Sequence, residues 1–178
     1  QNELWRSFGV PYQPDGSVTV AGAASPTLTI EPGLEIRFND LQTFSIGTPT
    51  VPGGLLAIGT PAAPIRFTTS RASVQPGSWR GIRFEAGATS SSRMAFVTVD
   101  SAGFRNEANE AGIMLNASVT VEDVTVTSNR QVGIRIYGGA PTIRRCVVAG
   151  TQLDEAVGLD IAAGSPTSAS AASRRPTG

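Results

Sequence analysis

The sequence repeats the phrase Gly81-Ile82-Arg83-Phe84 as Gly112-Ile113-Met114-Leu115, as Gly133-Ile134-Arg135-Ile136 and as Gly158-Leu159-Asp160-Ile161. Each copy is a glycine followed by an apolar, a variable and an apolar residue. The four glycines are separated by 31, 21 and 25 residues. Alternation with a period of two indicates a β-strand, and recurrence every ~20–50 residues is typical of solenoids. The phrase therefore predicts a solenoid built from strand-rich coils.

Aligning the copies predicts inward columns of apolar side chains that run along the stack. A second strand follows in each coil, with the pattern apolar-x-x-apolar-x-apolar beginning at Met94, Val121 and Ile143. Cys146 falls in a column of this second strand, so we expect a small buried hydrophobic residue rather than a reactive thiol. The two columns of the repeated phrase are Ile82, Ile113, Ile134 and Leu159, and Phe84, Leu115, Ile136 and Ile161.

Upstream of the phrase, short alternating segments separated by Gly and Pro predict further strands. Three of these segments have a distinctive order: Leu28–Gly33 (LTIEPG), Gly59–Thr68 (GTPAAPIRFT) and Gly77–Phe84 (GSWRGIRF). Together they resemble bacterial secreted proteins with right-handed parallel β-helix repeats, which have the pectate-lyase-like superfamily fold. The resemblance covers roughly residues 5–162. It implies an all-β, right-handed parallel β-helix of about six to seven coils, and it implies no particular activity.

The sequence divides into three parts. Residues 1–16 contain Trp5, Phe8 and two prolines, and we expect an N-terminal cap whose aromatic side chains plug the first coil. Residues 17–163 are expected to form the β-helix. Residues 164–178 are rich in Ser, Ala and Pro, which predicts a linker or frayed tail. The last coil would then need cover from further sequence, from a partner or from another copy of the chain.

Composition excludes several functional classes. The chain has 14 basic and 14 acidic residues, and every basic residue is arginine. A neutral chain without a basic run has little electrostatic reason to bind nucleic acid. The absence of histidine excludes a Ser-His-Asp or Cys-His site, and a single cysteine excludes an intramolecular disulfide and a cysteine-cluster metal site.

The ends and the hydropathy of the chain suggest a location. No apolar run is long enough for a transmembrane segment. The chain begins at Gln1 without Met and without an apolar signal region, so we expect a mature chain after processing or a cut piece of a longer one. Together with the resemblance, this predicts a bacterial protein that is secreted, periplasmic or at the cell surface.

The variable positions of the repeats predict polar columns on the outside. Arg135 and Asp160 are adjacent in one column, and Arg83 and Tyr137 lie beside them, so these four side chains are the candidate ligand-binding residues. In the second strand, Glu122-Asp123 faces Arg144-Arg145 of the next coil. We favour a cross-coil charge ladder that fixes the register of the strands over a polar binding site.

Two longer excursions interrupt the repeats, Ser101–Ala111 and Thr151–Val157. They contain Arg105, Glu107 and Glu110 in the first case, and Asp154 and Glu155 in the second. If both excursions leave the same corner of the coils, they would wall one end of a groove.

Four functional hypotheses follow. The first is a non-catalytic extracellular module for adhesion, scaffolding or contact with glycans on a cell surface. The second is a polysaccharide lyase or glycoside hydrolase acting on an acidic polysaccharide, with calcium as a cofactor only if it is a lyase. The third is end-to-end self-assembly. The fourth is an ice-binding plane of stacked threonines, which we disfavour because the sequence contains no continuous threonine column. We favour the first, with no cofactor and no metal; the catalytic candidates for the second are Asp100, Glu122, Asp123, Arg144 and Arg145.

Overall fold

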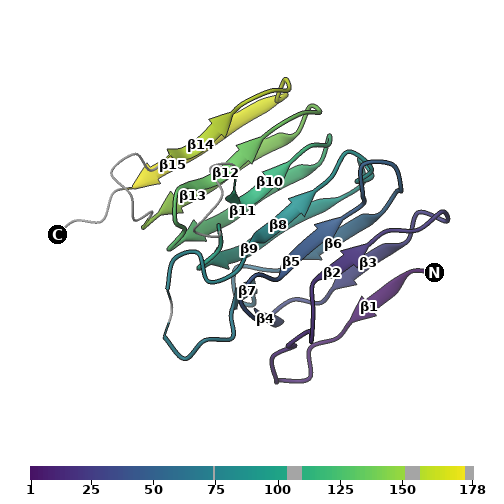
Figure 1. Cartoon of the computed structure of the whole chain (residues 1–178), viewed down its shortest axis with the longest axis vertical. Coiled ribbons are helices and arrows are strands. Elements are labelled where there is room, and N and C mark those ends of the chain that lie inside the picture. Colours follow the sequence, from purple (N-terminus) through teal and green to yellow (C-terminus); the bar gives the residue numbers. More distant parts are fainter. Residues whose placement is uncertain (74, 104–109, 151–156, 175–178) are drawn as a thin grey trace.

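A computed structural model describes residues 1–73, 75–103, 110–150 and 157–174. Within these residues all regular structure is β-strand, and all strand pairing is parallel. The strands lie side by side in a stack that begins with β1 near the N-terminus and ends with β14 and β15 near the C-terminus (Figure 1). The prediction of an all-β, parallel architecture is therefore confirmed, and the arrangement is compatible with a parallel β-solenoid.

The strands form two sheets. The six-stranded sheet contains, in sequence order, β2 (Val18–Val20), β5 (Thr43–Ile46), β8 (Gly81–Phe84), β10 (Ala111–Leu115), β12 (Val132–Ile136) and β14 (Val157–Ile161). The nine-stranded sheet contains β1 (Glu3–Trp5), β3 (Thr27–Ile30), β4 (Glu35–Phe38), β6 (Gly54–Ile58), β7 (Ile65–Thr69), β9 (Arg93–Asp100), β11 (Thr120–Thr127), β13 (Thr142–Ala149) and β15 (Ser168–Arg174). The chain passes back and forth between the two sheets, and β3 with β4 and β6 with β7 are consecutive strands of the nine-stranded sheet. The strands of one passage pair with strands of neighbouring passages.

The predicted columns form the core between the sheets. Ile113 of β10 is in register with Ile82 of β8 and Ile134 of β12, and all three side chains are fully buried. Leu159 and Ile161 of β14 continue the two columns at the C-terminal end of the stack. Cys146 is buried, as predicted, and burial raises the pKa of its thiol. Aromatic side chains fill the core of the N-terminal half, where Phe38 stacks on Trp79 with ring centroids 4.6 Å apart.

A repeated bend explains the spacing of apolar residues in β9, β11 and β13. Phe96, Asp123 and Arg145 occupy equivalent positions in these strands and have left-handed backbones, with φ of 51°, 52° and 50°. Non-glycine residues rarely adopt this conformation, so its recurrence marks a corner that each passage repeats. The corner rotates the strand, so the inward side chains do not strictly alternate. Counted from the first inward residue of each strand, the next two lie three and five residues further on.

The glycine of the repeated phrase has a steric cause. A Cβ atom on Gly81 would lie 2.6 Å from the carbonyl oxygens of Ala111 and Gly112 in the neighbouring strand. One on Gly133 would lie 2.3 Å from a methyl carbon of Val148. Both distances are shorter than any contact that a real Cβ makes, so the side chain has to be absent there.

The terminal segments differ from the sequence-based expectation. Residues 168–174 form strand β15 on β13, where we expected a linker or frayed tail. The register places Ala171 beside Cys146, and backbone pairing forms the strand although Ala171 is too small to fill the core. At the N-terminal end, Trp5 of β1 packs on Tyr12 and Phe44. Phe8 is 72 % exposed and therefore does not plug the end of the stack as expected.

Candidate functional site

The outer face of the six-stranded sheet brings together the four predicted ligand-binding residues. Arg83, Met114, Arg135 and Asp160 are consecutive neighbours across β8, β10, β12 and β14. Their side chains alternate with the buried columns, so they project from the opposite face of the sheet. Tyr137 follows β12, and its backbone N–H donates to the carbonyl oxygen of Leu115 at 2.7 Å, which extends the ladder by one residue.

A groove of about 360 Å³ lies on this face, at the carboxyl ends of β8, β10 and β12. Its floor combines a guanidinium group, a carboxylate, a thioether, a side-chain amide and a phenol ring. Met114 packs with Ala111, Val132 and Tyr137 in an apolar cluster that is separate from the core between the sheets. The residues that line the groove are Arg83, Phe84, Glu85, Met114, Asn116 and Tyr137.

Glu110 holds the arginines at the edge of this groove. Its carboxylate accepts a hydrogen bond of 2.7 Å from Arg83 and lies 3.7 Å from a guanidinium nitrogen of Arg80. The Glu110 side chain is almost fully buried, which strengthens these interactions because water screens them little. This pairing is not among the sequence-based predictions. The signal was present, since Glu110 immediately precedes the strand that pairs with the strand of Arg83.

Arg135 and Asp160 form the ion pair that the sequence predicts. The Nε of Arg135 donates to Oδ2 of Asp160 at 2.6 Å across β12 and β14. Both side chains are partly buried. The pair lies in the same row as Arg83, so it extends the polar surface of the groove toward the C-terminal end of the stack.

A second cluster of charges lies on the nine-stranded sheet. Arg145 forms ion pairs with both Glu122 and Asp123, and Arg93 reaches Glu122 from the opposite side through a hydrogen bond of 2.8 Å. The predicted ladder between neighbouring coils is therefore confirmed for Arg145. Arg144 points elsewhere and lies 3.5 Å from the hydroxyl of Ser168.

The arginines of this second cluster stabilise the ionised carboxylates. A hydrogen bond from Arg93 lowers the pKa of Glu122, and a hydrogen bond from Arg145 lowers the pKa of Asp123. Burial opposes both shifts, and the hydrogen bonds outweigh it. Each group therefore stays ionised to a lower pH than a free carboxyl group and less often carries a proton that it could donate.

The structure keeps Asp100 apart from Glu122 and Asp123. Asp100 is in register with Thr127, five residues beyond Glu122 along β11 and past the bend at Asp123. Its buried carboxylate accepts hydrogen bonds from Thr68 at 2.5 Å and from Arg66 at 2.8 Å. The five catalytic candidates therefore belong to separate clusters and do not form one site.

The two predicted walls of the groove fall largely outside the described residues. Arg105, Glu107, Asp154 and Glu155 belong to residues 104–109 and 151–156, which the structure does not describe. Both excursions run from the nine-stranded sheet to the six-stranded sheet, from β9 to β10 and from β13 to β14. They therefore start from the same edge of the stack.

Within the described residues, no three His, Cys, Asp or Glu side chains are grouped so that they could hold a metal ion. The same part of the chain contains no helix of the length and apolarity needed to cross a membrane. Comparison with protein-family models, curated proteins and solved structures finds no match to the chain.

Proposed function

We propose that the chain is a right-handed parallel β-helix of about six to seven coils that acts as a non-catalytic binding module outside the cell, secreted or on the cell surface. The alternation between two parallel sheets supports the β-helix, because each passage adds one layer to the stack. Right-handedness follows from the rule that parallel strands are joined by right-handed crossovers. The ligand we propose is a glycan.

The composition of the groove is the observation that carries this proposal. A sugar ring presents an apolar face and a rim of hydroxyl groups. Tyr137 and Met114 offer an apolar surface for the ring, while Asn116, Glu85 and Arg83 offer donors and acceptors for the hydroxyls. A site with a few convergent polar groups on an apolar floor is the usual form of a small-ligand site.

The charged residues favour binding over catalysis. A glycoside hydrolase needs a carboxylic acid whose pKa is raised so that it can protonate the leaving oxygen. Arginine neighbours shift the pKa values of Glu122 and Asp123 in the opposite direction. Asp100 accepts hydrogen bonds from Arg66, Thr68 and Ser101, so its carboxylate oxygens are already occupied.

The test is a glycan array probed with the wild-type chain and with Tyr137→Ala and Asn116→Ala. We expect a subset of glycans to bind the wild type and to lose most binding to both variants. Arg144→Ala is the matched control, because Arg144 is exposed on the other sheet. Equal binding by Tyr137→Ala and the wild type, or no bound glycan at all, would exclude this groove as the site.

The same preparations are assayed for new reducing ends and for unsaturated products on pectin, alginate and glycosaminoglycans. We expect no product from any of them. Product that disappears in Asp123→Ala would establish the alternative of a polysaccharide lyase or glycoside hydrolase. Dependence of that product on calcium would identify the lyase.

End-to-end self-assembly is a second candidate, favoured by the distribution of exposed apolar side chains. Leu4, Phe8 and Val10 lie at the N-terminal end of the stack, and Val157 and Ile161 lie at the C-terminal end. Both ends also present edge strands, which can pair with another chain. Sedimentation velocity over a concentration series tests this candidate: self-association should occur in the wild type and be abolished in Ile161→Asp.

A further inference from the structure

Three partly buried side chains form a row at the carboxyl end of the groove on the six-stranded sheet. Glu85, Asn116 and Tyr137 directly follow β8, β10 and β12, and all three line the groove. The backbone N–H of Asn116 donates to the carbonyl oxygen of Phe84 at 2.8 Å, so the ladder between β8 and β10 continues into the row. The Cα atoms of Glu85 and Tyr137 are therefore about 10 Å apart, twice the spacing of neighbouring strands.

Glu85 is the acidic member of this row. Among the described residues, no group donates a hydrogen bond to its carboxylate, and no arginine lies within ion-pair distance of it. The side chain is nevertheless only partly exposed. A ligand that covers this carboxylate without pairing with it removes water from an ionised group, which is unfavourable. A ligand that brings a positive charge to Glu85 avoids this penalty.

The arginines of the same face are directed away from Glu85. Arg83 lies two residues earlier in β8, and its Nη2 donates to Glu110 at 2.7 Å. Glu110 directly precedes β10, so this contact draws the guanidinium group toward the amino end of the strands. Arg135 donates to Asp160 at 2.6 Å. The negative charge of Glu85 therefore remains at the carboxyl end of the groove.

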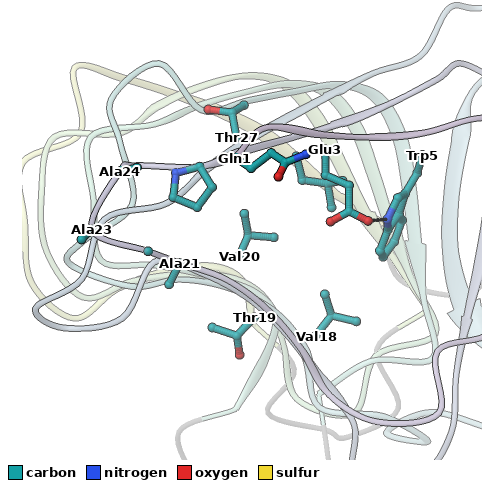
Figure 2. A pocket seen from close by; sticks show the side chains of 13 residues that line it. Gln1, Glu3, Trp5, Val18, Thr19, Val20, Ala21, Ala23, Ala24 and Thr27 are labelled. Carbon is teal, nitrogen blue, oxygen red and sulfur yellow. Dashed lines mark hydrogen bonds between the residues drawn. The ribbon is translucent and has the colours of Figure 1, made fainter.

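A larger cavity beside β2, of about 460 Å³, contains a carboxylate in a different situation. Glu3 lines this cavity and accepts a hydrogen bond of 3.1 Å from Nε1 of Trp5 (Figure 2). The carboxylate of Glu3 thus has a donor within the chain, which the carboxylate of Glu85 lacks among the described residues. Glu3 lies on the other sheet, so it is a matched control for Glu85.

The neighbours of Glu85 suit a sugar ring. Met114 and Tyr137 pack together and offer an apolar surface for the face of the ring. Asn116 lies between Glu85 and Tyr137 in the row, and its amide can donate to and accept from hydroxyl groups. A ring that packs on Met114 and Tyr137 therefore extends across Asn116 toward Glu85. The substituent on that edge of the ring is the one that meets the carboxylate.

We propose that the glycan bound by this groove carries a protonated amino group, as in a hexosamine whose nitrogen is not acetylated. This inference rests on the proposed glycan-binding function and adds the class of sugar to it. The ammonium group donates charge-assisted hydrogen bonds to Glu85, while the ring packs on Tyr137 and Met114. An N-acetylated sugar brings only a neutral amide to Glu85, and a uronic acid brings a second carboxylate.

The probes are three trisaccharides with the same β-1,4-linked backbone. They are the trimers of glucosamine, N-acetylglucosamine and glucose, which differ in having an ammonium, an acetamido or a hydroxyl group at the same carbon. We expect the glucosamine trimer to bind the wild type at least about tenfold more tightly than either of the others, because only it forms charge-assisted hydrogen bonds with a carboxylate. Calorimetry measures the three affinities.

Three protein variants locate the preference. Glu85→Gln removes the charge and keeps the size of the side chain, and we expect it to lose the preference for the glucosamine trimer while it binds the glucose trimer like the wild type. Glu3→Gln changes the net charge of the chain by the same amount and should keep the preference. Tyr137→Ala removes the surface for the ring and should weaken the binding of all three trimers.

The amino-sugar inference and the proposed function fail in different ways. If the wild type binds the three trimers equally and Tyr137→Ala weakens all of them, the groove binds glycans and the amino-sugar inference is wrong. If no trimer and no glycan of the array binds the wild type, both are wrong. A preference for the glucosamine trimer that persists in Glu85→Gln, or that Glu3→Gln also removes, would overturn the inference, because it would arise away from Glu85.

A basic peptide is the other source of an ammonium group. Trilysine with blocked ends carries ammonium groups but no sugar ring, so it cannot pack on Tyr137 and Met114 as a sugar does. We expect it to displace a labelled glucosamine trimer much less effectively than the unlabelled trimer does. Equal displacement by the two competitors would identify a basic peptide segment as the ligand and would overturn the proposal.

Discussion

Arg145 contacts Asp123 across neighbouring strands through two parallel hydrogen bonds, from Nε to Oδ1 and from Nη2 to Oδ2, each 2.6 Å long. Both residues sit at the left-handed corner that recurs in each passage. Arg145 also reaches Glu122, which Arg93 contacts from the other side. A bidentate pair at a repeated corner fixes the register of one passage against the next.

This cluster predicts a dependence of stability on pH. The folded pKa values of Glu122 and Asp123 lie below their unfolded values, so the ion pairs contribute stability above about pH 4, and this contribution is lost as the pH falls through the folded pKa values. The double variant Glu122→Gln/Asp123→Asn should be less stable than the wild type at pH 7. The difference in urea midpoint should shrink as the pH falls below about 4 and the carboxylates become protonated. A difference that stays constant over this range would contradict the assignment.

The close approach at Gly81 predicts a large effect of one methyl group. Gly81→Ala should lower the free energy of unfolding by about 2 kcal/mol or more, because its φ of +103° and the oxygens of Ala111 and Gly112 both oppose a side chain. Gly16→Ala is the matched control, since a Cβ there meets nothing within 4 Å. Urea denaturation compares the two variants, and an equal effect of both would refute the steric explanation.

Burial of Cys146 predicts an unreactive thiol. The side chain is 2 % exposed, and burial raises its pKa, so little thiolate is present at neutral pH. Ellman's reagent at neutral pH should label the native chain only at the rate of its unfolding, and should label one thiol promptly in denaturant. Prompt labelling of the native chain would mean that the C-terminal passages open readily.

The buried carboxylate of Glu110 predicts a cost in stability when it is removed. Glu110→Ala leaves Arg83 and Arg80 without this carboxylate in a poorly hydrated site, and we expect a loss of about 3 kcal/mol. Glu85→Ala is the control, since Glu85 forms no ion pair within the described residues and should change stability by less than about 0.5 kcal/mol. Thermal unfolding of both variants gives the comparison.

The sequence predicts most of the fold because the inward columns repeat in the chain. Ile82, Ile113 and Ile134 are adjacent in space as aligned, and so are the residues of the predicted pair Arg135 and Asp160. Strand β5 escapes the glycine-based alignment. Its Phe44 and Ile46 continue the same columns, but Thr43 stands where later copies have glycine.

The remaining differences arise where backbone or tertiary contacts prevail over side-chain pattern. β15 forms although Ala171 contributes little to the core, because the free edge of β13 supplies hydrogen-bond partners. The pairing of Glu110 with Arg83 was not predicted because Glu110 lies just outside the repeated phrase, directly before the strand that pairs with the strand of Arg83. Strand β1 was not predicted either, because its three residues are too few for a pattern to indicate a strand.

The shared register of β8, β10 and β12 has an evolutionary consequence. Since Ile113 relates to Ile82 as Ile134 relates to Ile113, a duplicated or deleted passage would join its neighbours without changing their geometry. Such a chain can lengthen or shorten its outer face one layer at a time. Unequal recombination of its gene can therefore change the length of this face, while each surviving layer keeps the contacts it already has.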